Sequence, residues 1–123
     1  MGKKILVADD EEIVRKVLRV NLNKWGHEVR EAVDGVQALE HLSKDKFDLL
    51  ICDIVMPNKN GWELVKEVKS NPETKDLPVI VLTAKNEDAD MFQGYVLGAT
   101  YYITKPFTKA QLLYGLNLVF GEG

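Results

Sequence analysis

Five polar residues of this chain could do chemistry together if the fold brings them to one place. Each lies at or just beyond the end of an apolar run: Asp9, Asp10, Asp53, Thr83 and Lys105. Three carboxylates in one crevice would repel one another, since two unit charges about 4 Å apart cost about 4 kcal/mol at an effective dielectric of about 20. Lys105 can neutralise part of this charge and a divalent cation the rest. Oxygen ligands of this kind suit Mg²⁺, so the pattern predicts a magnesium site that a phosphate oxygen would complete.

The chemistry that suits such a site is phosphoryl transfer to a carboxylate, which forms an acyl phosphate. Asp53 is the better nucleophile because it stands alone after its apolar run, whereas Asp9 and Asp10 are adjacent and suit metal binding. Lys105 would stabilise charge on the transferring oxygens, and Thr83 could donate a hydrogen bond to one of them. Taken singly, each residue also has a plainer explanation as a helix cap, a turn residue or a solvated charge.

The elements that must position these residues alternate along the chain. Apolar runs typical of strands are each followed by a segment with apolar residues at helical spacing. The expected strands are 4–8, 27–32, 47–52, 78–82 and 100–103; the expected helices are 12–25, a helix entered at Asp34-Gly35, 62–68, 87–97 and 108–119. Parallel strands need crossover connections, so this alternation predicts an α/β, doubly wound parallel sheet with helices on both faces. Ligands of such sheets bind beyond the carboxyl ends of the strands, where the five polar residues fall.

Composition narrows the class of protein further. The chain has 123 residues, of which 46% are hydrophobic and 28% charged, with a net charge of -3. These values and the absence of a linker or repeat predict one domain over residues 1–123. No apolar run approaches the length of a membrane span and no signal-peptide pattern is present, so we expect a cytoplasmic protein without a membrane partner. The chain lacks a basic cluster interleaved with aromatic residues, which argues against direct nucleic-acid binding. Cys52 lies in an apolar run and should be a buried thiol.

The chain resembles the receiver (response regulator) family of two-component systems over essentially its whole length. The matching motifs are Val7-Ala8-Asp9-Asp10-Glu11, Asp53-Ile54-Val55-Met56-Pro57 with Gly61, Val81-Leu82-Thr83-Ala84, Gly98-Ala99 and Lys105-Pro106-Phe107. The resemblance implies a flavodoxin-like five-stranded parallel sheet of order 2-1-3-4-5 with five helices.

The resemblance also implies roles for individual residues. It makes Asp53 the phosphoacceptor of a histidine kinase. It implies that Asp9 and Asp10 bind Mg²⁺, together with Asp53 and the backbone carbonyl of Val55. Lys105-Pro106 resembles the dipeptide of the family whose peptide bond is cis, a geometry that would aim the lysine into the crevice.

Thr83 and Tyr102 are the switch pair that the resemblance implies. Movement of the Thr83 hydroxyl toward a phosphoryl group would open space for an aromatic ring to rotate, and the partner-binding surface would change. The alternative is that Tyr102 is a strand aromatic that packs on its neighbours. The resemblance also implies that Val55 and Lys85 flank the path of a hydrolytic water, at two positions that vary within the family, which leaves the lifetime of the phosphorylated state open.

The resemblance implies two kinds of partner. A sensor histidine kinase or a phosphotransfer protein would supply the phosphoryl group. A downstream protein would dock on the face formed by helix 4, strand 5 and helix 5, that is, segments 87–97, 100–103 and 108–119. Because the chain ends at Gly123 without an effector region, we expect a stand-alone receiver of the chemotaxis type or a phosphorelay intermediate. It would not be an enzyme beyond catalysing its own phosphorylation and dephosphorylation.

Two other functions fit the sequence less well than this switch. A phosphatase that forms an aspartyl phosphate would need a second Asp two residues after the nucleophile, and that position is Val55. A scaffold that works without phosphorylation would have a degenerate site, but the acidic, hydroxyl and lysine positions are all filled. The phosphorylation switch is therefore favoured.

Overall fold

A five-stranded parallel sheet forms the centre of the protein, as seen in a computed structural model that describes residues 2–83 and 98–121. The strands are β1 (Lys4–Ala8), β2 (Glu28–Ala32), β3 (Leu49–Asp53), β4 (Val79–Thr83) and β5 (Tyr101–Thr104). Their order is β2-β1-β3-β4-β5, and neighbouring strands are parallel. The predicted flavodoxin-like order is confirmed.

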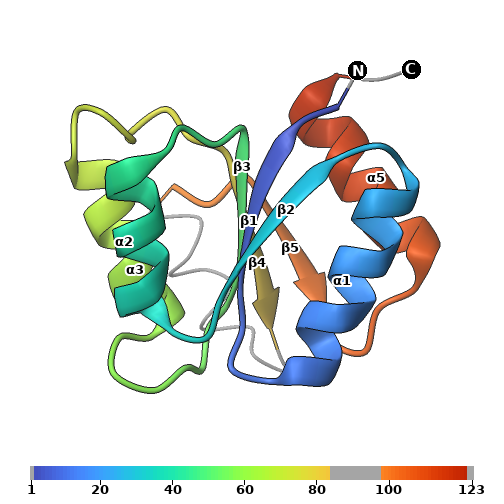
Figure 1. Ribbon diagram of the computed structural model, residues 1–123, viewed down its shortest axis with the longest axis horizontal. Helices are drawn as coiled ribbons and strands as arrows, with labels where there is room; N and C mark the ends of the chain where they lie inside the picture. Colours follow the sequence, from blue (N-terminus) through green and yellow to red (C-terminus); the bar gives the residue numbers. More distant parts are fainter. Residues whose placement is uncertain (1, 84–97, 122–123) are drawn as a thin grey trace.

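Helices cover both faces of this sheet. They are α1 (Glu12–Lys24), α2 (Gly35–Lys44), α3 (Gly61–Ser70) and α5 (Lys109–Phe120). In Figure 1, α1 and α5 lie on one face of the sheet and α2 and α3 on the other. The predicted bounds agree with these elements to within one or two residues, whereas the expected helix 87–97 lies outside the described residues.

The core divides into two layers because successive strand residues point to opposite faces of the sheet. β3 and β4 are buried at every position, as expected for strands covered on both sides. One layer packs against α2 and α3, and its buried strand residues are Leu6, Ala8, Ala32, Leu50, Cys52, Val79, Val81 and Tyr102. The other packs against α1 and α5, and its strand residues are Ile5, Val7, Leu49, Ile51, Ile80, Leu82 and Ile103. The Cys52 thiol is buried as predicted, and burial raises its pKa.

Side-chain caps fix where three helices begin. The Asp34 carboxylate accepts a hydrogen bond from the Gln37 backbone N–H and starts α2. Asn60 starts α3 and Thr108 starts α5, each in a capping box with the residue three positions later. These caps determine where the loops beyond β3 and β5 end, and both loops border the carboxyl edge of the sheet. Among the described residues, no helix has the length and apolar character needed to cross a membrane.

Candidate functional site

Three of the predicted site residues share one face of the sheet. Asp53 ends β3 on the side that faces α1 and α5, since it follows Leu49 and Ile51 at alternate positions. Asp9 and Lys105 continue the same alternation beyond β1 and β5. β1 and β3 are neighbours, with Ala8 opposite Cys52, so Asp9 comes to lie next to Asp53.

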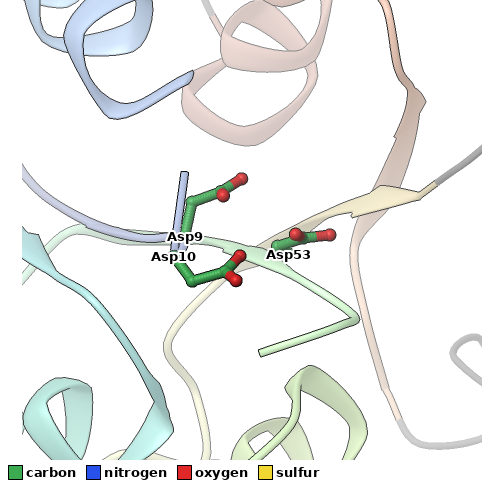
Figure 2. A group of neighbouring side chains, drawn as sticks. All are labelled: Asp9, Asp10 and Asp53. Atoms are coloured by element: carbon green, nitrogen blue, oxygen red, sulfur yellow. The ribbon is translucent and has the colours of Figure 1, made fainter. Parts of the chain in front are cut away.

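The three aspartates lie close together at the carboxyl ends of β1 and β3 (Figure 2). Asp9, Asp10 and Asp53 each offer one carboxylate oxygen, and these oxygens all lie within 4.8 Å of one another. Asp9 is fully buried and Asp53 is 7% exposed, whereas Asp10 is exposed. The predicted acidic cluster is therefore present, with one open side toward solvent.

Asp9 is held on several sides. Its Oδ1 accepts a hydrogen bond from the Glu11 backbone N–H at 2.8 Å, and its carbonyl accepts one from Arg15 Nη1 at 2.7 Å. Its Oδ2 lies 3.0 Å from Lys105 Nζ but accepts no hydrogen bond of good geometry from the residues described. A buried carboxylate oxygen in this state suits a cation ligand, because a buried polar atom normally has a partner.

Lys105 is the cation of the site. Its Nζ donates hydrogen bonds of 3.0 Å to Asp53 Oδ2 and to Glu11 Oε1, in addition to the ion pair with Asp9. Burial alone would lower the pKa of the Lys105 ammonium, but the three carboxylates outweigh burial and raise this pKa. The Lys105–Pro106 bond is cis, as the resemblance implied. The lysine is therefore a permanent positive charge beside Asp53.

The negative charge of the site exceeds the positive charge of the lysine. Burial raises the pKa of Asp53, and the neighbouring Asp9 raises it further, although Lys105 and the Ile54 backbone N–H act in the opposite direction. Among the described residues, the three aspartates and Glu11 lie around one ammonium, that of Lys105. Hard oxygen ligands and uncompensated negative charge fit Mg²⁺. The residues present therefore suit the predicted metal.

The two switch residues lie on the other face of the sheet. Thr83, at the end of β4, is 1% exposed and stands opposite Thr104 in the β4–β5 ladder. Tyr102 precedes Thr104 by two residues, so it shares that face, and it is 5% exposed. Its ring packs against Trp62 of α3, with ring centroids 6.2 Å apart. The structure thus places Tyr102 inside the α2–α3 layer, and its role as a switch remains a prediction.

Val55 lies in the loop directly after β3, and its side chain is 74% exposed. The loop returns to the sheet where the Gly61 backbone N–H donates a 2.7 Å hydrogen bond to the Ile54 carbonyl. The role of the Val55 carbonyl as a metal ligand stays a prediction. Lys85, which the resemblance implies lies with Val55 beside the path of a hydrolytic water, is outside the described residues.

Two residues of the site were not predicted from the sequence. Glu11 follows the aspartate pair in one of the matching motifs, but its contact with Lys105 does not follow from the sequence. Arg15 supports Asp9 from α1 and also pairs with Glu31 of β2 at 3.1 Å. The available signal is weak: an acid directly after the aspartate pair, and an arginine four positions after that acid.

Comparison with known proteins supports this architecture. The model of the response regulator receiver domain matches residues 5–117. A crystal structure described as a response regulator from Chloroflexus aurantiacus J-10-fl is 34% identical with a TM-score of 0.94, covering 99% of this chain and 100% of that chain. The chemotaxis response regulator CheY4 of Vibrio cholerae is 34% identical with a TM-score of 0.91, and the match covers 98% of this chain and 100% of that chain.

A third similar structure bears on the metal. It is the receiver domain of the sensor histidine kinase PA1611 from Pseudomonas aeruginosa PAO1, with a magnesium ion coordinated in its active site cleft. It is 26% identical with a TM-score of 0.89, and the match covers 99% of this chain and 100% of that chain. With the family match, the sheet order and the acidic cluster together, the chain belongs to the response regulator receiver domain family.

Proposed function

We propose that this receiver domain is a signalling switch that accepts a phosphoryl group on Asp53 in a Mg²⁺-dependent reaction. One observation carries the proposal. Asp53 lies 3.0 Å from the Lys105 ammonium, and one of its oxygens lies within 4.8 Å of oxygens of Asp9 and Asp10. A carboxylate beside both a fixed cation and an acidic cluster that suits a divalent metal supports a role in phosphoryl transfer.

The chain's own residues would act as follows. An Asp53 oxygen attacks phosphorus, a new P–O bond forms, and the bond from phosphorus to the donor's leaving atom breaks, with the electron pair going to that atom. Lys105 offsets negative charge on the phosphoryl oxygens. Asp9, Asp10 and Asp53 would hold Mg²⁺, which when bound supplies positive charge to the transferring group.

The phosphoryl group would come from a sensor histidine kinase or a phosphotransfer protein. The output would be a protein target that binds the face including β5 and α5, where Leu113, Tyr114 and Leu118 are exposed. The helix-87–97 part of this face lies outside the described residues. The catalysis of the domain would be limited to its own phosphorylation and dephosphorylation.

Intact mass measured after incubation with acetyl phosphate tests the proposal. We expect the wild type to gain one phosphoryl group with Mg²⁺ and none with a metal chelator. Asp53→Asn should gain none under either condition. Asp76→Asn removes an exposed aspartate elsewhere and should behave as wild type. A wild type that gains no phosphoryl group, or an Asp53→Asn variant that still gains one, would contradict the proposal.

A further inference from the structure

We infer that Glu11 is a displaceable partner of Lys105 that holds the lysine in the resting state and weakens binding of a phosphoryl group at Asp53. The inference rests on the proposed function. Three carboxylate oxygens, from Asp9, Glu11 and Asp53, lie 3.0 Å from Lys105 Nζ. Two of the three ammonium protons are donated to Asp53 and Glu11, and the same nitrogen forms an ion pair with Asp9 Oδ2. A phosphoryl oxygen that binds Lys105 therefore competes with one of these carboxylates.

Glu11 is the partner that leaves at the smallest cost. Its side chain is 56% exposed, so water can solvate the carboxylate once it moves away. The Asp9 side chain is fully buried, so water could not solvate its carboxylate if the ion pair with Lys105 were broken. Asp53 carries the phosphoryl group and stays in place.

The Glu11 side chain has no competing task as a helix cap. Glu11 occupies the position before α1, but its side chain accepts no hydrogen bond from the first turn of that helix. Its backbone N–H, by contrast, holds Asp9 Oδ1 at 2.8 Å, a contact that any side chain at position 11 can keep. The backbone of Glu11 thus supports the metal site, and its side chain restrains the lysine.

Glu11 opposes phosphorylation in two ways. It occupies a donor of Lys105, and its negative charge stands close to the site of an incoming anion. The two effects can be separated by variants. Glu11→Gln removes the charge with little change in shape. Glu11→Asp keeps the charge but shortens the side chain by one C–C bond, about 1.5 Å, which withdraws the carboxylate from Lys105.

Binding of beryllium fluoride, a tetrahedral analogue of the phosphoryl group, tests the inference at fixed Mg²⁺. We expect Glu11→Gln to bind the analogue about two- to five-fold more tightly than wild type, the range that an exposed ion pair supplies. Glu11→Asp should lie between the two. Glu12→Gln removes the same charge from an exposed neighbour on α1 and should match wild type. Titrations followed by backbone-amide NMR give affinity and confirm that each variant is folded.

The outcomes separate the two proposals. If Glu11→Gln matches wild type, the lysine exchanges another partner and the inference is overturned. A different result would be that Glu11→Asp binds beryllium fluoride as the wild type does, and that Glu12→Gln binds it as tightly as Glu11→Gln does. In that case the loss of net charge explains the tighter binding, and the contact between Glu11 and Lys105 does not. If the wild type binds no beryllium fluoride with Mg²⁺ and gains no phosphoryl group from acetyl phosphate, the proposed function itself fails.

Discussion

Asn58 donates a 2.6 Å hydrogen bond from its side-chain amide to Oδ2 of Asp34, a residue 24 positions earlier in the chain. The other oxygen of Asp34 accepts the Gln37 backbone N–H at 2.8 Å. Beside this contact, the Gly35 backbone N–H donates to the Lys59 carbonyl at 3.1 Å. Asn58 has φ 66°, a left-handed conformation that asparagine tolerates better than most residues. One carboxylate therefore caps α2 and anchors the loop that follows Asp53.

The Asp34 contact should make stability depend on pH. The hydrogen bonds from Gln37 and Asn58 lower the pKa of Asp34 below its ordinary value of 3.8, and burial opposes them only in part. As the pH falls, the unfolded chain binds the proton first, so the stabilisation by ionised Asp34 is complete well above pH 3.8 and declines below about pH 5.

Asp34→Asn isolates this effect because it keeps an oxygen acceptor but does not titrate. The free energy of unfolding of the wild type, minus that of Asp34→Asn, should decrease between about pH 6 and about pH 3. Urea denaturation across this range measures the difference. Glu40→Gln, at an exposed position of the same helix, should give a much flatter difference. A constant difference for Asp34→Asn would show that the contact does not favour the ionised carboxylate.

The alternation of strands and helices and the strand-end positions of the site residues could be anticipated from apolar periodicity, whereas the strand order came from the family resemblance. The exact strand ends could not. The predicted strands stopped at residues 52 and 82, but Asp53 and Thr83 still pair in the sheet. Both are polar, so an apolar pattern misses them, although the backbone ladder continues through them.

Contacts between polar side chains far apart in the chain could not be predicted from the sequence pattern. The position of Lys105 beyond β5 predicts that it lies near Asp53, but not that Glu11 shares its ammonium. The hydrogen bond between Asn58 and Asp34 depends on how the loop after β3 lies against the start of α2. Such contacts depend on loop conformation and side-chain rotamers, which periodicity does not specify.

Gly61 should tolerate no side chain. A Cβ there would overlap the Asp53 carbonyl oxygen and come within 2.8 Å of Ile54 Cα, and neither backbone atom can move without disturbing the end of β3. We expect Gly61→Ala to lower the free energy of unfolding by about 1–3 kcal/mol. Gly115→Ala is the control, since its nearest neighbour is the Tyr101 side chain at 3.2 Å, which can shift. Equal urea midpoints for the two variants would contradict this explanation.

Lys105 should compete with Mg²⁺ for the same oxygens. Its ammonium lies 3.0 Å from Asp9 Oδ2 and from Asp53 Oδ2, so it repels a dication bound there. Lys105→Met should therefore bind Mg²⁺ about ten-fold more tightly, a gain of about 1.4 kcal/mol, while its affinity for beryllium fluoride falls. Lys109→Met removes the same charge from an exposed position at the start of α5 and should change neither the Mg²⁺ affinity nor the beryllium fluoride affinity. Calorimetric titration measures both affinities, and weaker Mg²⁺ binding by Lys105→Met would refute the competition.

Arg15 and Arg19 offer a matched pair for testing how α1 supports the metal site. Both pair with Glu31, at 3.1 Å and 2.6 Å, but Arg15 also donates to the Asp9 carbonyl at 2.7 Å. Groups that orient a metal ligand commonly change metal affinity when removed, so Arg15→Ala should weaken Mg²⁺ binding by about ten-fold. Arg19→Ala loses the same charge and a bond to the same glutamate, and should bind Mg²⁺ as wild type does. If both variants weaken Mg²⁺ binding equally, the contact with Glu31 or the net charge explains the weaker binding. If only Arg15→Ala weakens Mg²⁺ binding, the orientation of Asp9 explains it.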